Sequence, residues 1–527
     1  MLPSRSQRAS HAATTCSARR GGWIVATKWI DATGTRRRSI NGSRGPRIGL
    51  CLVCAILLGA LGPVATTSQA SPAPQDAPSS IVYLPLALHG TAASELVPPA
   101  PAPSATPDTT ALPPTTLPTA TATPAPSATA EPLPAIELDG DWVRTPHYAL
   151  LSPSAAVDKR DLGHMMEQFY AQASAYFGAE PAGADRLVGK VFADSASYRA
   201  GLAADGITDD LGSSGGYYSP HTKAFYLFVQ PSRHYTRMLT MHEAGHRLQN
   251  LAGGCSYPGW WTEGEAEHLG MHTWDGRTLH MARQPLISLE DHPKSALDAF
   301  RDKGGDVGPI VRGDGGWSYR EAWAVVSFLR AAHPAQFDGL RARYCAGEPS
   351  AEAWQAVFGA PVSAAMNAAY EAWLVANQQP WRWVWNAFEP WGDRGLHGQA
   401  DSNALAILKE RPAKLEVAIE PISEAMAAGI VVAYYGTEDF VMLRLFADRS
   451  LQVIRVTEGF RWQWLKSGSA PEPADGALDR MSATVEGDRL ILAMNGEAFF
   501  VLDDPRDLAG TFGVNLEGCE LRLTVLP

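Results

Sequence analysis

Basic residues are scarce over most of this 527-residue sequence. Residues 71–527 contain 34 Lys and Arg against 54 Asp and Glu, which gives this part a formal charge of −20. Residues 1–70 have the opposite balance, with ten basic residues and a single acid, Asp31. Because an acidic surface repels phosphate backbones, the long acidic part excludes nucleic acid as an expected partner.

Long apolar runs are also few, and the run at residues 48–65 directly follows the basic region. Ser68-Gln69-Ala70 comes next, with small residues at both ends. A basic region, an apolar core and a small-residue site are typical of a secretory signal peptide, here residues 1–70. We expect a secreted or cell-surface protein. An uncleaved membrane anchor is the alternative, since the run has the minimum length for spanning a bilayer. Neither Cys51 nor Cys54 follows a small residue, so lipoprotein cleavage is not expected.

Cysteine is rare as well, and only Cys255, Cys345 and Cys519 follow the signal region. An odd number of cysteines in an exported chain leaves at least one without a partner in the same chain. Cys255 and Cys345 fall in the same predicted domain and could form a disulfide. Three buried thiols are the alternative, and the sequence does not decide between the two.

Large apolar side chains are nearly absent between Val97 and Pro134, where Pro, Ala, Thr and Ser dominate. Such a segment cannot bury a core, and its prolines favour an extended backbone. We expect residues 71–136 to form a disordered linker, or stalk, that includes a short apolar strand-like stretch at residues 79–90.

Helical patterns dominate residues 137–382, after a few strand-like segments. Residues 186–194, 215–220 and 224–230 have the character of strands. Pro361 suits the first position of a helix, where a missing N–H costs nothing. Strands followed by helices indicate an α+β domain. Apolar residues at helical spacing predict helices at residues 158–177, 234–251, 262–273, 318–332 and 361–376.

The pattern changes in residues 383–527 to short segments in which apolar and polar residues alternate. They include GIVVAYY, VMLRLFA, LQVIRVT and RLILAMN, separated by turns rich in Gly, Asp and Asn. Asn495-Gly496 is a strong signal for a two-residue hairpin turn. Regularly spaced short strands of this kind predict an all-β sandwich or barrel.

A candidate metal site lies in the predicted helix at residues 234–251, where His242, Glu243 and His246 form a His-Glu-x-x-His motif. Residues four apart lie on the same side of a helix, so both imidazoles could bind one ion. Glu243, one residue further round, could then act as a base. The alternative for this motif alone is a solvated helix face with two incidental histidines.

The sequence after this motif strengthens the metal interpretation. The segment PGWWTEGEAEHLG contains a Trp-x-x-Glu-Gly motif whose acid is Glu263. The chain here resembles the gluzincin zinc metallopeptidases and the bacterial peptidase-MA-like proteins, over about residues 140–376. The resemblance implies a zincin-like fold, with His242, His246 and Glu263 as ligands of Zn²⁺ and Glu243 as the general base.

Two neighbouring acids compete with Glu263 for the role of third ligand. Sixteen residues separate His246 from Glu263, and the commoner spacing of about eighteen would land on Glu265. We prefer Glu263 because the Trp-x-x-Glu-Gly motif fixes the start of the helix. Glu267, one turn later on the same face, could hold the outer nitrogen of a ligand histidine. A charged, solvated helix end is the alternative for the whole cluster.

The extended metzincin pattern does not fit this chain. It has a glycine and a third histidine downstream, where this sequence has Gln249 and Ala252. The gluzincin branch is therefore the zincin branch to which we compare the motif.

Peptide hydrolysis also needs a group that stabilises the tetrahedral oxyanion. Tyr319, His268 and His272 are the candidates, and Tyr319 is preferred because its segment extends the resemblance. The alternative for Tyr319 is helix packing against Trp323. The aromatic strand at residues 217–218 could lie at a cleft edge to which a substrate adds as a β-strand, although core packing is the simpler expectation.

Residues 385–527 resemble concanavalin A-like sandwich domains, particularly the bacterial laminin-G-like group, in their strand pattern and turns. The resemblance implies a jelly-roll sandwich that could bind carbohydrate. Trp462 and Trp464 alternate on one predicted face, where they could stack on sugar rings or simply cover the sandwich. The segment lacks the closely spaced pair of acids on one strand that a retaining glycosidase would need.

Together these features predict a multidomain protein: a signal peptide, a disordered linker, an α+β zincin-like domain (137–382) and an all-β jelly-roll sandwich (383–527). The expected function is a secreted zinc metallopeptidase that hydrolyses peptide or protein substrates through a zinc-activated water. One alternative is a cell-surface protein that binds carbohydrate or protein and has an inactive zincin scaffold. A third reading is an esterase or deacylase. Glu243 argues against an inactive scaffold, because a structural metal site has no use for a base.

Overall fold

The computed structural model of the protein describes residues 134–181, 185–208, 214–253, 255–385, 388–398, 404–421, 427–517 and 520–527. The predicted signal peptide, almost all of the predicted linker and Cys519 lie outside these residues. Among the described residues, none of the helices combines the length and the apolar character needed to cross a bilayer.

The first part of the described chain combines a sheet with helices. Its sheet contains β1 Glu137–Asp139, β2 Trp142–Arg144, β3 Tyr148–Leu151, β4 Leu187–Phe192, β5 Gly216–Ser219 and β6 Ala224–Phe228. A two-stranded ribbon is formed by β7 His272–Trp274 and β8 Leu279–Met281. The helices are α1 Lys159–Phe177, α2 Ser195–Ala204, α3 Arg233–Gly253, α4 Gly259–Gly270, α5 His292–Asp302, α6 Gly308–Arg312, α7 Tyr319–Ala332, α8 Pro334–Cys345, α9 Ser350–Phe358 and α10 Ala364–Ala376.

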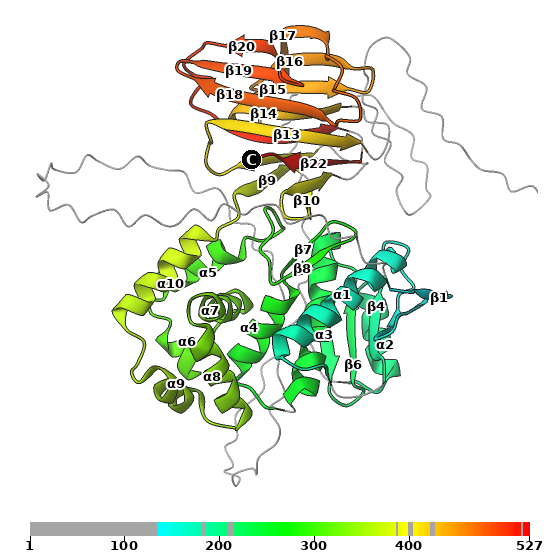
Figure 1. Cartoon of the computed structure of the whole chain (residues 1–527), viewed down its shortest axis with the longest axis vertical. Helices are drawn as coiled ribbons and strands as arrows, with labels where there is room; N and C mark the ends of the chain where they lie inside the picture. Colours follow the sequence, from blue (N-terminus) through cyan, green and yellow to red (C-terminus); the bar gives the residue numbers. More distant parts are fainter. Residues whose placement is uncertain are drawn as a thin grey trace, which may run out of the picture. The chain divides into compact units, whose positions relative to one another are not determined.

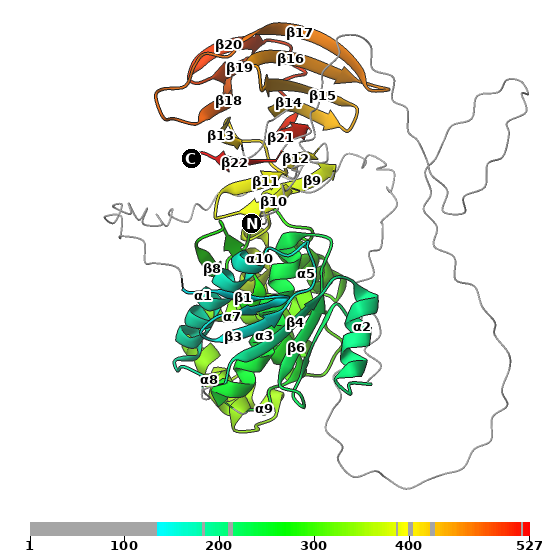
Figure 2. The ribbon, with the colours of Figure 1, turned by 90° about the vertical axis from the view of Figure 1, so that its right-hand side faces the viewer.

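The six-stranded sheet has the order β1-β2-β3-β4-β6-β5, so β5 is an edge strand. Strands β3, β4 and β6 run parallel, whereas β5 pairs antiparallel with β6. Successive side chains of a strand point to opposite faces, and both faces of this sheet are apolar. Phe225 of β6 packs with Met165 of α1 and Met241 of α3, while Tyr226 packs with Tyr198 of α2. Figure 2 shows α2 across the sheet from α1.

The two helices that contain the predicted metal ligands pack against each other, and α4 also packs against α7. Figure 1 shows α4 between α3 and α7. Glycines permit this close approach. A Cβ on Gly264 would lie 2.4 Å from the carbonyl oxygen of Ala322 in α7, and a Cβ on Gly270 would lie 2.8 Å from that of Met238 in α3. A larger residue at either position would push the helices apart.

The predicted strands and helices of this part are present, with shifted ends. Helices α1, α3 and α7 begin within one residue of their predicted starts. Helix α4 begins at Gly259 rather than at Thr262, and it ends at Gly270 because the chain then enters β7. Helices α2, α5, α6, α8 and α9 were not predicted.

The prediction for Pro361 was wrong. Helix α10 begins at Ala364, three residues later. Ser363 is its N-cap, and the Ser363 side chain accepts a hydrogen bond from the backbone N–H of Met366. A serine that satisfies one of the unpaired N–H groups of the first turn decided the start of the helix, rather than the proline ring.

The second part of the described chain is a β-sandwich, as predicted. Its first sheet has the order β10-β11-β22-β13-β18-β19-β20 and its second sheet β17-β16-β15-β14-β21-β12-β9 (Figure 2). The strands are β9 Trp381–Trp385, β10 Phe388–Trp391, β11 Gly395–Gly398, β12 Ala404–Leu408, β13 Lys414–Pro421, β14 Ala427–Gly436, β15 Asp439–Phe446, β16 Ser450–Thr457, β17 Arg461–Ser469, β18 Asp479–Glu486, β19 Arg489–Met494, β20 Glu497–Leu502, β21 Thr511–Glu517 and β22 Leu521–Val525.

Alternating side chains build the core between the two sheets. Ile430 and Leu443 of the second sheet meet Val417 and Leu492 of the first in one buried apolar cluster. The predicted hairpin turn is also present. Asn495 and Gly496 connect β19 to β20 with φ of 51° and 84°, the positive values that a type I′ turn requires.

The outer face of the second sheet carries its own apolar cluster, which includes Ile454 and Val456 of β16. Trp464 lies directly opposite Ile454 in the ladder, and Trp462 lies opposite Val456, so both indoles share this outer face. Trp462 is 47% exposed and Trp464 58% exposed. Neither tryptophan is therefore a core residue of the sandwich.

The sandwich contacts the α+β part through Glu389 of β10. The two carboxylate oxygens of Glu389 accept hydrogen bonds from the backbone N–H groups of Arg233, at 2.7 Å, and His234, at 2.8 Å. Glu389 is 2% exposed. A side chain of the sandwich thus caps the first turn of α3, the helix with the His-Glu-x-x-His motif.

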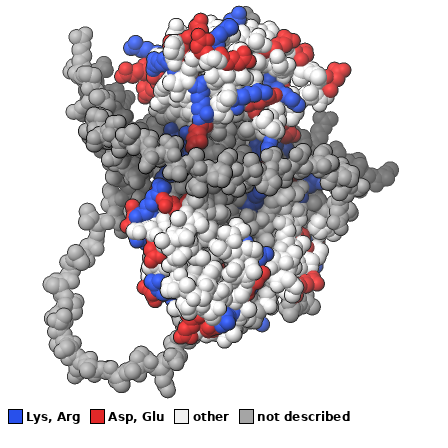
Figure 3. Space-filling view, turned by 60° about the vertical axis from the view of Figure 1, so that its left-hand side comes forward, with Lys and Arg blue, Asp and Glu red and all other residues white. Residues whose placement is uncertain are grey.

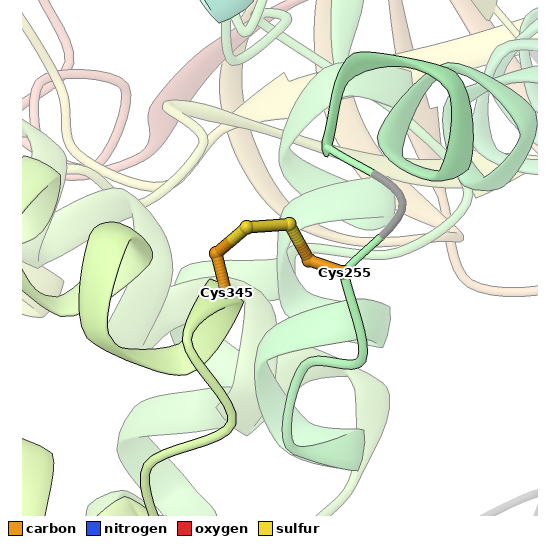
Figure 4. Close-up of a disulfide and its surroundings, with 2 residues drawn as sticks. All are labelled: Cys255 and Cys345. Atoms are coloured by element: carbon orange, nitrogen blue, oxygen red, sulfur yellow. A yellow bond between two sulfur atoms is a disulfide. The ribbon is translucent and has the colours of Figure 1, made fainter.

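Cys255 and Cys345 form a disulfide. Figure 4 shows Cys345 at the end of α8 and Cys255 in the connection between α3 and α4. The sequence left this pairing open. The bond ties the short connection between α3 and α4 to a helix 90 residues later in the chain.

Charged side chains are mixed on the surface. On the face drawn in Figure 3, basic and acidic side chains of the described residues are interspersed. Ion pairs among the described residues include Lys303 with Glu321 and Arg449 with Asp479, each at 2.7 Å. This face of the described residues therefore presents charges of both signs close together.

Candidate metal centre

His242 and His246 face each other across one turn of α3. Both are buried, at 3% and 5% exposed. Their Nε2 atoms lie 3.1 Å apart, and their rings meet at 88°. Together with Glu243, they place three potential ligand atoms within 4.8 Å of one another. These residues could therefore hold a metal ion.

Glu263 of α4 lies against both histidines. Its Oε2 is 3.4 Å from the Nε2 of His242 and 3.4 Å from the Nε2 of His246. Three ligands at Zn²⁺ bonding distance in a tetrahedral site lie about 3.3 Å from one another. The ligand triangle, defined here as the two Nε2 atoms and this Oε2, has sides of 3.1, 3.4 and 3.4 Å and fits such an ion.

The environment of Glu263 also suits a cation. Both of its carboxylate oxygens are buried, and no described residue donates a hydrogen bond to either. Burial would raise the pKa of Glu263, but the His246 and His242 imidazoles outweigh burial and lower it to about 2. A buried carboxylate that stays ionised needs positive charge next to it.

Glu243 points its carboxylate to the same place from α3. It is 1% exposed, and it packs on Gly216 of β5, where a Cβ would lie 2.5 Å from its Oε1. Burial raises the pKa of Glu243 to about 7, against the lowering effect of the two histidines. A carboxyl group whose pKa lies near neutral pH can both accept and return a proton.

Tyr319, the first residue of α7, also faces the ligand residues. Its ring centroid lies 6.2 Å from that of His242. Burial raises the pKa of Tyr319, and the negative charges of Glu263 and Glu243 raise it further. The phenol therefore keeps its proton at neutral pH and can serve as a hydrogen-bond donor.

The two other predicted oxyanion candidates are engaged elsewhere. The Nδ1 of His268 lies 2.8 Å from the hydroxyl of Ser327 in α7. His272 stacks on His234 with ring centroids 4.5 Å apart, and its Nδ1 bonds to the carbonyl oxygen of Gly270. Burial lowers the pKa of His268 to about 4 and that of His272 to about 3.

Glu267 lies between two histidines. Its Oε1 is 3.9 Å from the Nδ1 of His242, and its Oε2 is 3.6 Å from the Nε2 of His292 in α5. These distances exceed a hydrogen bond, so Glu267 acts on His242 through its charge. His292 was not predicted, because it is far from the motif in sequence.

Gln249, which lies one turn after His246 on α3, was also not predicted. Its Oε1 is 3.2 Å from the Nδ1 of His246, and its Nε2 donates a hydrogen bond of 2.9 Å to Glu265. Glu265, the rival third ligand, thus contacts Gln249 instead of the ligand triangle. The only sequence signal for Gln249 was its position three residues after a histidine of the motif.

A separate cavity of about 760 Å³ lies away from the ligand triangle. It is lined by residues near the starts of α1 and α3 and by residues of the first sandwich sheet, including Trp391 and His397. Some of its charged groups pair with each other. Asp161 bonds to Arg237 at 2.6 Å, and His397 lies 2.8 Å from Glu520.

Comparisons with known proteins give matches to structures alone. No protein-family model matches the sequence, and no curated protein matches it. The chain is similar to a carbohydrate binding module, CBM66 from Bacillus subtilis, with 14% identity over 28% of this chain and 93% of that one, at a TM-score of 0.24.

Two further structures are similar over 28% of this chain. The Caenorhabditis elegans galectin LEC-6 is 12% identical, with 96% of its chain covered and a TM-score of 0.18. A Bacillus licheniformis β-glucanase is 9% identical, with 88% covered and a TM-score of 0.21. Likenesses this weak do not extend to the chemistry of this chain.

Proposed function

We propose that this protein is a zinc-dependent hydrolase, and that its α+β part catalyses the cleavage of peptide bonds in a substrate. The observation that carries the proposal is the buried triangle of His242, His246 and Glu263 with the Glu243 carboxylate beside it. Structural zinc sites are closed by four protein ligands, whereas catalytic sites have three protein ligands and leave a fourth position for water. Three candidate ligands with a carboxylate beside them support a site of the second kind.

Each residue of the site then has a defined task. Bound Zn²⁺ would polarise the substrate carbonyl and make a water molecule more acidic. Glu243 would take a proton from the attacking water and give it to the leaving amine, a role that suits its raised pKa. Tyr319, which keeps its proton, would donate a hydrogen bond to the oxyanion.

Strand β5 supports an extended peptide as the substrate. It is the edge strand of the sheet, and Gly216 within it contacts Glu243. A peptide that paired with β5 as an added strand would run past the Glu243 carboxylate. The rings of Tyr217 and Tyr218 pack in apolar clusters, as the simpler expectation had it, so the proposed pairing uses the backbone of β5.

The test combines zinc analysis with digestion of a broad peptide library by wild-type protein and Glu243→Gln. Removal of a general base costs about 10²- to 10⁴-fold in rate, so the variant should bind zinc and cleave far more slowly. A chelator should abolish cleavage, and added zinc should restore it. Bound zinc without cleavage by the wild type would refute the peptidase.

A second candidate function is binding of carbohydrate or another cell-surface ligand by the sandwich. It is favoured by the two exposed indoles of Trp462 and Trp464 on one face. Grouped exposed aromatic side chains are typical of binding sites. The Arg444 guanidinium lies 5.2 Å from the Trp462 ring, but it is buried and paired with Glu517, so the exposed part of this surface is aromatic.

Glycan-array binding by the full-length Glu243→Gln protein would test this candidate without interference from hydrolysis. Replacing Trp462 and Trp464 with Ala should abolish binding. Tyr435→Ala removes another partly exposed aromatic ring of the sandwich, 40% exposed, and should leave binding unchanged. Equal loss in both proteins would contradict a site at the two tryptophans.

A further inference from the structure

We infer that Glu265, acting through the side-chain amide of Gln249, fixes the tautomer of His246 so that its Nε2 presents a lone pair to the ligand triangle. The inference rests on the proposed metal site and adds two positioning residues to it. Neither residue is a ligand, and neither lies at the reacting atoms.

The orientation of the Gln249 amide is fixed by its neighbours. Its Nε2 lies 2.9 Å from the Oε2 of Glu265 and 3.1 Å from the carbonyl oxygen of Thr262. Both neighbours accept hydrogen bonds. If the amide were turned round, its oxygen would face two other oxygens without a proton between them. Gln249 is 4% exposed, so water does not relieve that conflict.

This orientation of the Gln249 amide determines which nitrogen of His246 carries the hydrogen. The amide oxygen is left facing the Nδ1 of His246 at 3.2 Å. An amide oxygen only accepts hydrogen bonds, so Nδ1 must carry the hydrogen. A neutral imidazole has one N–H, which leaves the lone pair on Nε2. That atom is the one that lies 3.4 Å from Glu263 and 3.1 Å from the Nε2 of His242.

Two hydrogen-bond donors hold Glu265 in place. Glu265 is fully buried, and its Oε1 accepts hydrogen bonds from Arg341 of α8 at 2.7 Å and from the Tyr176 hydroxyl at 2.9 Å. The Arg341 guanidinium also lies over the rings of Tyr176, at 4.6 Å, and Phe337, at 4.9 Å. The carboxylate is therefore fixed from α1 and α8 and transmits its orientation to α3.

His242 lacks an equivalent arrangement. Its Nδ1 has no hydrogen-bond partner among the described residues, and the nearest carboxylate oxygen, from Glu267, is 3.9 Å away. The two ligand histidines thus differ. His246 has its tautomer set by neutral and charged groups of the fold, whereas His242 is influenced by charge alone.

The experiment measures the tautomer directly, with ¹⁵N NMR of the His246 ring in metal-free, full-length protein, assigned with His246→Gln. Zinc dissociation constants come from chelator competition. Wild type should show the Nδ1–H form. In Glu265→Gln the new amide can offer an N–H to Gln249, so the Gln249 amide can turn and the Nε2–H form should appear. Loss of such a supporting contact weakens metal binding by about 10- to 100-fold.

Two further variants make the test specific. Gln249→Leu leaves the Glu265–Arg341 pair intact and should also release the tautomer and weaken zinc binding. Glu321→Gln is the matched control, because Glu321 is another buried acid of this part, 3% exposed and paired with Lys303. It should change neither the His246 signals nor the zinc affinity.

An Nε2–H ring in the wild type, or an unchanged tautomer in both Glu265→Gln and Gln249→Leu, would overturn the inference. Failure of the wild type to bind zinc would instead refute the proposed function. The tautomer in metal-free protein would still report on Glu265 and Gln249 in that case.

Discussion

Three carboxylates of the site act together on the pKa of His242. Burial lowers the pKa of His242, but Glu263, Glu267 and Glu243 together raise it to about 9. In metal-free protein the ring therefore holds a proton at neutral pH. Zn²⁺ binds only a neutral imidazole, so the ion must displace this proton.

We therefore expect zinc affinity to increase with pH, by up to about tenfold per pH unit, and to level off above the His242 pKa of about 9. Calorimetry in buffers of different ionisation enthalpy should detect proton release on zinc binding at neutral pH. In Glu267→Gln one of the raising charges is gone, so the affinity should level off at a lower pH. A pH-independent affinity would contradict this account.

The sequence was sufficient to locate the three residues of the triangle, but not the residues that support them. His242 and His246 are related by the helical repeat, and Glu263 belongs to a second motif, so all three could be located without coordinates. The contact of Gln249 with His246 depends on where Glu265 and Arg341 lie, on two other helices. No local spacing contains that information.

At the scale of helices, the contact between α4 and its neighbours is set by glycines. Gly264→Ala would place a Cβ 2.4 Å from a backbone carbonyl oxygen of α7, which cannot move like a side chain. We expect this substitution to lower the free energy of unfolding by about 1–3 kcal/mol and to weaken zinc binding, as measured by denaturant unfolding and chelator competition.

Gly245→Ala provides the control, because a Cβ there has its nearest neighbours at 3.6–3.9 Å, an ordinary contact distance. It lies within the His-Glu-x-x-His motif, yet it should retain zinc affinity. Alanine also favours a helix over glycine, so stability should not fall. Equal effects of the two substitutions would argue against the steric explanation.

The disulfide between Cys255 and Cys345 ties the connection between α3 and α4 to α8. Replacing Cys255 and Cys345 with Ser should lower the stability of the folded protein by about 2–4 kcal/mol, because the unfolded chain regains the freedom of a long loop. Thermal unfolding of wild type with a reductant should reproduce the effect. A reductant that lowers the melting temperature of the double Ser variant equally would show that another cause is responsible.

Helix ends were the least predictable elements, and two residues show why. Pro361 has the backbone geometry for a first turn, but Ser363 supplies the hydrogen bond that starts α10.

Trp462 and Trp464 have the alternation of a strand, which predicts a shared face. Exposure of that face depends on the packing of the second sheet and could not be deduced from alternation.

At the scale of the molecule, Glu389 couples the sandwich to α3. Glu389→Ala would remove the acceptor of the Arg233 and His234 N–H groups, at a cost of about 1–3 kcal/mol for the buried His234 group. Hydrogen exchange measured by mass spectrometry should become faster at the start of α3. Asp507→Asn, at another buried acid that pairs with Arg455 within the sandwich, should leave exchange in α3 unchanged.

The position of Glu389 also bears on the order in which the protein matures. Strand β10 pairs with β11, and β11 pairs with β22, which is made about 270 residues after the end of α3. During translation, the motif helix leaves the ribosome long before the ladder that supports its cap can close. We expect the histidines to reach their final alignment only after β22 has docked, so the proposed metal uptake would follow the synthesis of β22.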